Sequence, residues 1–176
     1  MPKNILEEIA MSKVLSDLDR KIVSILMEDA SITNVELSKR VNISPSVCLT
    51  RTNRLRKEGI IKQYVAILDE EMVGMEFMAF TEVTLSTPNR KTADMFVAHI
   101  STLPNILECY NISGDSDFLL KVLAKNTSDF RNFVLDKLMS FDGVGKISTN
   151  VVLSVEKRTF SFLDGDGGSA EDTPSE

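Results

Sequence analysis

Two short helical patterns joined by a turn constrain this chain more than any other feature. The first begins at a capping box, because Thr33 and Glu36 stand three residues apart. The second begins at Ser44, a favoured N-cap, followed by Pro45, which fits the first helical position because its missing N–H has no partner there anyway. This helix is predicted to run to about residue 58, and Gly59 suits the left-handed position just past its end. Two short helices arranged in this way predict a helix-turn-helix.

Another helix is predicted ahead of this pair, over residues 15–26, with Ser16 as its N-cap and Asp19 at the third helical position. Its apolar residues recur on one face: Leu18, Ile22, Ile25 and Leu26. Beyond the helix-turn-helix, residues 60–68 favour β-structure, and we expect a small wing and a linking strand there. The boundary between two domains is predicted near residues 68–74.

The net charge of -6 conceals an uneven distribution along the chain. Residues 1–64 hold 11 lysines and arginines against 8 acids, whereas residues 65–163 hold 9 against 13. Residues 164–176 hold no basic residue and 5 acids, and they are predicted to form a disordered acidic tail. The basic surplus therefore belongs to the predicted helix-turn-helix, where a nucleic-acid partner would need it.

The helix after Pro45 has two different faces. We expect an inward stripe of Cys48, Thr52, Leu55 and Gly59, and an opposite face of small polar and cationic residues. Such a face fits the major groove of DNA, where Arg pairs with guanine and Asn with adenine, while flanking cations such as Arg51, Arg56 and Lys62 suit phosphates. A merely solvated surface helix is the alternative. The predicted DNA-binding residues are Ser44, Ser46, Thr50, Arg51, Asn53, Arg54 and Lys57.

The second half changes period repeatedly and predicts an α+β domain. Strands are expected at residues 77–85, 106–112, 118–123 and 147–155, and helices at residues 93–103 and from Thr127 or Ser128 to about 141. The order βαββαβ is that of a ferredoxin-like sandwich, which carries both helices on one face of an antiparallel sheet. The other face is predicted to be too apolar for water, and a partner subunit is the simplest cover.

Several other classes of protein are disfavoured. No apolar run is long enough for a membrane span, and the first residues do not resemble a signal peptide, so we expect a cytoplasmic protein without membrane partners. Cys48 and Cys109 lack metal-ligand spacing and are expected to be buried thiols. The lone His99 has no partners typical of an active site, so no enzyme, cofactor or metal is predicted, and residues 164–168 lack the later ligands of a calcium loop.

Several motifs in this order resemble one known family. In the first half they are residues 18–22, 31–41, 43–46, 54–61 and 64–69. In the second half, residues 113–121 contain Gly114-Asp115-Ser116-Asp117, which is similar to a Gly-Asp-x-Asp signature. From residue 15 to about 162 the chain resembles the Lrp/AsnC, or feast/famine, transcription regulators. The resemblance implies a winged helix-turn-helix dimer whose sensor domains pair through their sheets and often assemble into tetramers or octamers.

The resemblance also implies an effector, usually an amino acid, in a cleft between sensor domains. The family's effector region carries over to Gly114, Asp115, Asn150, Val151 and Val152. Asp115 or a neighbouring backbone group would take the α-amino group, and peptide N–H groups the carboxylate. The alternative for Gly114 and Asp115 is a plain hairpin turn, in which Gly supplies a positive φ and Asp caps the turn.

The sequence therefore predicts three parts: a winged helix-turn-helix domain with a linking strand at residues 1–68, a ferredoxin-like sensor and oligomerisation domain at residues 69–163, and the tail at residues 164–176. The predicted function is a sequence-specific, nucleoid-associated transcription regulator whose homo-oligomer responds to an amino acid. An architectural protein that compacts DNA without an effector is the alternative. A thermal-shift screen of amino acids separates the two, because only a ligand that binds the folded state raises its stability.

Overall fold

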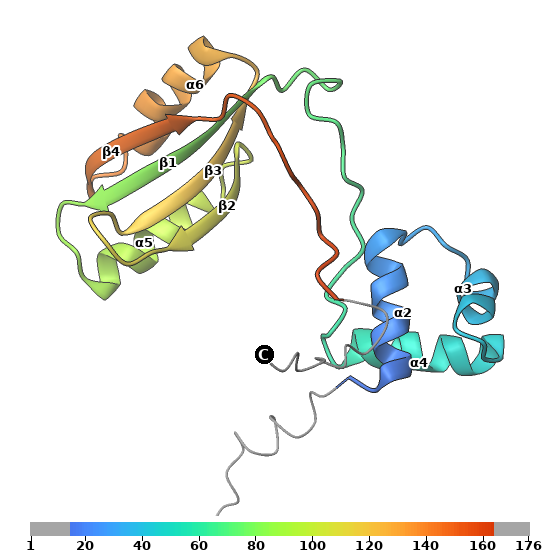
Figure 1. Cartoon of the computed structure of the whole chain (residues 1–176). Helices are drawn as coiled ribbons and strands as arrows, with labels where there is room; N and C mark the ends of the chain where they lie inside the picture. Colours follow the sequence, from blue (N-terminus) through green and yellow to red (C-terminus); the bar gives the residue numbers. More distant parts are fainter. Residues whose placement is uncertain (1–14, 164–176) are drawn as a thin grey trace, which may run out of the picture. The chain divides into compact units, whose positions relative to one another are not determined.

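The computed structural model describes residues 15–163, which divide into two compact units (Figure 1). Residues 15–66 and 157–163 belong to the first unit, and residues 67–156 form the second. The chain thus leaves the first unit, builds the second, and contributes seven more described residues to the first, a return that the predicted domain boundaries do not include. The expected acidic tail at residues 164–176 lies outside the described residues.

The first unit contains three helices, each begun by a polar side chain that accepts a backbone N–H: α2 (Asp17–Glu28), α3 (Asn34–Arg40) and α4 (Pro45–Lys57). Ser16 caps α2, and the predicted reciprocal box of Thr33 and Glu36 is present at α3. Ser44 caps α4 with Pro45 at its first position. The three predicted helix starts are therefore confirmed, and each follows from a hydrogen bond between near neighbours in the sequence.

The core of the first unit is small and lies between the three helices. Its buried apolar residues are Ile22, Val23, Leu37, Val41, Cys48 and Leu55. Leu163, from the returning segment, packs against the same cluster, and the hydroxyl of Ser24 donates to its carbonyl oxygen at 3.1 Å. The end of the described chain is therefore attached directly to α2.

The segment that follows α4 only partly matches the prediction. Gly59 has the expected positive φ of 75°, and the amide of Ile60 closes the helix on the carbonyl of Leu55 at 3.0 Å. The expected linking strand is not formed, because residues 60–76 include no strand. A strand needs a hydrogen-bonded neighbour, and residues 60–76 pair with no strand of the sheet within the described residues.

The second unit has the predicted order βαββαβ. Its elements are β1 (Phe77–Leu85), α5 (Arg90–Ile100), β2 (Ile106–Asn111), β3 (Phe118–Ala124), α6 (Thr127–Phe133) with its continuation η1 (Val134–Leu138), and β4 (Val144–Val151). The sheet order is β2-β3-β1-β4, with β1 antiparallel to both β3 and β4. Figure 1 shows the helices on one face of the sheet, so the expected ferredoxin-like architecture is confirmed.

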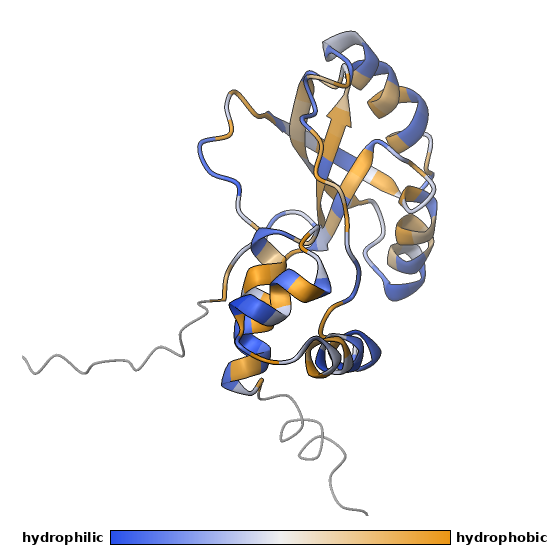
Figure 2. Cartoon of the chain, turned by 90° about the vertical axis from the view of Figure 1, so that its right-hand side faces the viewer, coloured by the Kyte–Doolittle hydropathy of each residue, from blue (hydrophilic) through white to orange (hydrophobic). Residues whose placement is uncertain are grey.

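Strict alternation along β1 builds the core of the second unit. Ala79, Thr81, Val83 and Leu85 are buried and face the helices, whereas the residues between them lie on the other face and are half-buried. Phe96 from α5 contacts the rings of Phe118 and Phe141, at 5.0 and 5.6 Å between centroids. Figure 2 shows hydrophobic residues on the strands and on parts of the helices. The core therefore lies between the sheet and its two helical segments.

Three details of the second unit correct the predictions. The cap of α6 is Asn126, one residue before the expected Thr127, because its side chain accepts from the amide of Asp129 at 2.9 Å. The last strand covers 144–151 rather than 147–155, because its antiparallel pairing with β1, which begins at Phe77, reaches no further than Val151. Cys109 is exposed, although Cys48 is buried as expected.

No helix among residues 15–163 is both long and apolar enough to cross a membrane. The same residues contain no group of three or more histidine, cysteine or acidic side chains that could hold a metal ion.

Candidate nucleic-acid interface and ligand site

The outward face of α4 carries most of the residues predicted to bind DNA. Ser46, Thr50 and Asn53 are exposed, as are Arg54 and Lys57. The hydroxyl of Thr50 donates to the carbonyl of Ser46 at 2.9 Å, which fixes its rotamer and leaves its methyl group directed away from that bond. The structure therefore brings small polar groups and cations together on one exposed helix face, as the spacing predicts.

Ser44 has a different role in this structure. Its hydroxyl accepts the amide of Val47 at 3.4 Å and lies 3.1 Å from the hydroxyl of Ser46. Ser44 therefore begins α4, and its O–H can still donate while its oxygen accepts the capping bond.

Arg51 and Arg54 do not point freely into solvent. Nη1 of Arg51 lies 3.0 Å from Oδ1 of Asp19, and Nη2 of Arg54 lies 2.5 Å from Oδ2 of the same carboxylate. The Asp19 side chain is only 3% exposed, and Ser16 donates to it as well, at 2.5 Å. One buried carboxylate in the first turn of α2 therefore holds two cations of α4.

The hydrogen bonds around Asp19 decide its protonation. Burial raises the pKa of its carboxyl, but hydrogen bonds from Ser16, Arg51 and Arg54, with the charge of Arg54, outweigh burial and hold the pKa below its usual value. Asp19 is therefore ionised at neutral pH. Sequence analysis expected Asp19 only as a helix-start residue and missed this role, because its partners lie 32 and 35 residues away.

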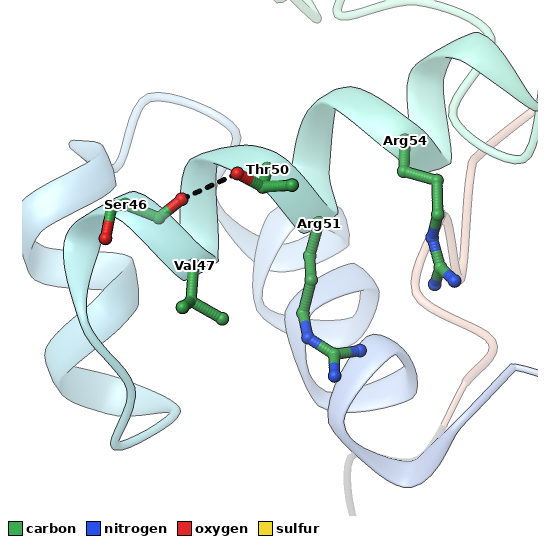
Figure 3. Close-up of a pocket in the computed structure, with 5 residues that line it drawn as sticks. All are labelled: Ser46, Val47, Thr50, Arg51 and Arg54. Atoms are coloured by element: carbon green, nitrogen blue, oxygen red, sulfur yellow. Dashed lines mark hydrogen bonds between the residues drawn. The ribbon is translucent and has the colours of Figure 1, made fainter.

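A hollow of about 370 Å³ lies on this side of α4, lined by Ser46, Val47, Thr50, Arg51 and Arg54. In Figure 3 the side chains of Arg51 and Arg54 leave α4 on the side where Val47 lies. Val47 is 45% exposed and was not among the predicted DNA-binding residues. The hollow therefore combines hydroxyls and guanidinium groups with one apolar side chain.

The predicted effector residues lie neither at one end of the second unit's sheet nor all on one face. The 113–117 turn adjoins the end of β1 at Leu85, whereas residues 150–152 lie beside residues 78–80, toward the other end of β1. Gly114 has a φ of 136° in the turn between β2 and β3, and neighbouring Asp115 is exposed. Asn150 pairs with Phe80 and lies on the face away from the helices, whereas Val151 pairs with buried Ala79 and lies on the helix side.

Glu82 connects the turn to β4 and was missed by sequence analysis. Its carboxylate accepts from the hydroxyl of Ser116 at 3.1 Å and from Nδ2 of Asn150 at 3.5 Å. Thr84, two residues along the same strand, donates to the carbonyl of Asp115 at 3.3 Å. The alternation of β1 places Glu82 on the outer face, but only the strand order shows that Asn150 is its neighbour.

The Asp115 carboxylate accepts no hydrogen bond from any residue within 15–163, and the Val152 amide donates to the carbonyl of Met78 at 2.9 Å. The turn and the outer face of β4 thus present a carboxylate and an amide, with the Glu82 carboxylate between them. These groups suit a small zwitterionic or amide-containing ligand.

Comparison with known proteins assigns both units. Residues 15–62 match the winged helix-turn-helix DNA-binding family, and residues 78–162 match the Lrp/AsnC ligand binding domain. The first unit is therefore a DNA-binding domain and the second a ligand-binding domain, which together define a ligand-responsive transcription regulator.

Named relatives match this chain over most of both lengths. The transcriptional regulator AzlB of Bacillus subtilis is 42% identical over 151 residues, 86% of this chain and 96% of its own. The leucine-responsive regulatory protein of Escherichia coli K12 is 36% identical over 147 residues, covering 84% of this chain and 90% of its own. This chain belongs to the Lrp/AsnC family of transcriptional regulators.

Solved structures agree with this assignment. A transcriptional regulator of Neisseria meningitidis, crystallised as a complex with L-Met, superimposes with a TM-score of 0.81 at 37% identity over 85% of this chain and 96% of its own. An AsnC family regulator of Agrobacterium tumefaciens gives a TM-score of 0.77 at 27% identity, over 82% of this chain and 94% of its own.

Proposed function

We propose that α4 is the recognition helix of a sequence-specific regulator and that Ser46, Thr50 and Asn53 meet base edges in the major groove. The observation that carries this proposal is the exposed polar face of α4 in a unit that matches a DNA-binding family. Small hydroxyls and an amide suit base edges because they reach the groove floor without a large loss of rotamer freedom. With DNA as its partner, the protein would act on the nucleoid in the cytoplasm.

Binding to duplexes selected by the wild-type protein from a random-sequence pool tests this proposal. We expect Asn53→Ala to weaken binding by about 1 to 3 kcal/mol and to relax sequence preference at one position. Arg54→Ala should weaken binding by a similar amount. Arg90→Ala is the matched control, because it removes one exposed cation from the ligand-binding unit. If Asn53→Ala and Arg90→Ala behave alike, α4 is not the reading helix.

We propose further that the ligand is an L-amino acid held beside the 113–117 turn and β4. Two facts support this: a similar regulator was crystallised with L-Met, and a relative is named leucine-responsive. The unpaired carboxylate of Asp115 would take the α-amino group, and Asn150 together with backbone amides near Gly114 the carboxylate.

A thermal-shift screen with L-Met and L-Leu as the first probes tests the ligand. A ligand at 100 times its Kd should stabilise the protein by about 2.7 kcal/mol, so binding is easily seen. Asp115→Asn should abolish the shift, whereas Asp142→Asn, at another exposed position, should leave it unchanged. A flat response to all twenty amino acids would favour the architectural alternative.

The oligomer expected from the sequence also remains a proposal. The sheet face away from the helices carries Phe80, Leu119 and Tyr110, and the segment before β1 exposes Val65, Ile67 and Leu68. Apolar groups arranged in this way favour a second copy of the chain as their cover. Light scattering should give a dimer or a multiple of it, such as a tetramer or octamer, and a monomer at micromolar concentration would refute the proposal.

A further inference from the structure

The cluster at Asp19 is built like a binding device rather than a simple structural ion pair. Arg51 and Arg54 stand three residues apart on one face of α4, and both reach the same buried carboxylate on α2. Ser16 supplies a third donor, so both carboxylate oxygens are occupied by ordered partners. The position of each guanidinium group is therefore fixed from a second helix.

Neither arginine is used up by this contact. A guanidinium group has five N–H donors, and each arginine gives one nitrogen to Asp19. Their side chains stay 33% and 48% exposed, and both border the hollow that Ser46, Val47 and Thr50 complete (Figure 3). Donors therefore remain available on the open side of the cluster.

The arginines stay paired with Asp19 when a ligand binds, since their departure would leave a buried carboxylate without its cations, which is strongly unfavourable. Nε of Arg54 also lies 3.8 Å from Oε1 of the exposed Glu58, so the cluster has two cations and two anions. A phosphodiester group would therefore bind through the remaining guanidinium N–H donors rather than by neutralising a surplus charge. Movement of the Arg54 side chain to the floor of the groove is disfavoured, because it would break the ion pair with Asp19.

We propose that Asp19 is a positioning residue of the DNA interface, which holds Arg51 and Arg54 as a clamp for one backbone phosphate. This rests on the proposed entry of α4 into the major groove. It reassigns Arg54 from base reading to the phosphate backbone, and it leaves sequence preference to Ser46, Thr50 and Asn53. Phosphate contacts of this kind set the register of a protein on DNA without reading sequence.

Asp19→Asn gives the sharpest test, because net charge alone and the positioning role predict opposite changes in affinity for DNA. The variant makes the interface more positive, so charge alone would tighten binding to any duplex. Positioning predicts about tenfold weaker binding to the selected duplex, since the two guanidinium groups lose their common anchor. Tighter binding, or unchanged binding in a variant that is folded by circular dichroism, would overturn the proposal.

Single methylphosphonate substitutions in the selected duplex locate the clamp. Substitution at one position should weaken binding by the wild-type protein but should not weaken binding by the Arg51→Ala, Arg54→Ala double variant any further. The dependence of log K on log salt concentration should also be shallower for the double variant, by about 0.9 per bound subunit, as expected for one lost phosphate contact rather than two. Arg54→Ala alone should weaken binding to all duplexes equally, and a changed base preference at one position would show that Arg54 reads a base.

If Asp19→Asn does not fold, the variants Arg51→Lys and Arg54→Lys replace it as the test. They keep the charge but lose the planar guanidinium group, and binding as tight as that of the wild type would refute the clamp. Loss of all duplex binding by the wild-type protein would instead refute the proposed function.

Discussion

The two units of this chain stabilise their functional groups in different ways. Among residues 15–163, the core of the DNA-binding unit has six buried apolar residues and that of the ligand-binding unit has twelve. The DNA-binding unit therefore depends more on helix caps and on the ion cluster at Asp19. The ligand-binding unit has a large aromatic core, and its polar network at Glu82 lies outside that core, on the open face of the sheet. In the DNA-binding unit, which has the smaller core, ion pairs fix the positions of the functional side chains. In the ligand-binding unit, the larger core lies on one side of the sheet, and the other side is free to bind a ligand.

The largest expected effect tests the core of the ligand-binding unit. Phe96→Ala removes a fully buried ring that contacts two other rings, and it should destabilise this unit by about 3 to 5 kcal/mol. Amide hydrogen exchange during a urea series should show lost protection in β1 and β3 while α2 keeps its own. An equal loss of amide protection in both units would contradict the conclusion that the two units are stabilised in different ways.

The ion cluster should show a marked asymmetry. Replacing Arg51 and Arg54 together by alanine strands the buried carboxylate and should cost about 3 kcal/mol in the DNA-binding unit. Asp19→Ala leaves two half-exposed arginines that water can solvate, and should cost about 1 kcal/mol. Urea midpoints followed by exchange in α2 measure both values, and equal costs would mean that Asp19 is not effectively buried.

Acid should weaken the DNA-binding unit through the same carboxylate. The pKa of Asp19 is lowered in the folded state from 3.8, so its contribution is present above about pH 4 and is lost as pH falls through the lowered pKa. Wild type should therefore lose more stability than Asp19→Asn between pH 5 and about pH 2. Parallel losses in urea titrations at each pH would show that Asp19 does not contribute.

The smallest expected effect is a gain in the ligand-binding unit. The hydroxyl of Thr81 is fully buried and has no hydrogen-bond partner within the described residues. Thr81→Val replaces it with a methyl group of similar size and should raise stability by up to about 1 kcal/mol. A loss on thermal unfolding would indicate that the hydroxyl is satisfied in solution.

Local signals account for what could be predicted from the sequence. The caps at Ser16, Thr33 and Ser44 act within three residues, and the spacing of hydrophobic residues along each segment shows which of its faces is buried. The order of helices and strands could therefore be predicted from the sequence. The Asp19 cluster, the neighbours of Glu82 and the return of Leu163 to α2 join residues far apart in the chain, and no spacing reports them. The expected linking strand is absent from residues 60–76 because β-propensity alone does not supply a hydrogen-bonded partner strand.

The most direct test of the account is amide hydrogen exchange on the full chain, with and without the selected duplex. We predict that protection on binding is greatest over residues 44–57, with a second increase in the first turn of α2 at Asp19. Protection confined to the ligand-binding unit, or none in α4, would contradict the claim that this helix and its anchored arginines form the DNA interface.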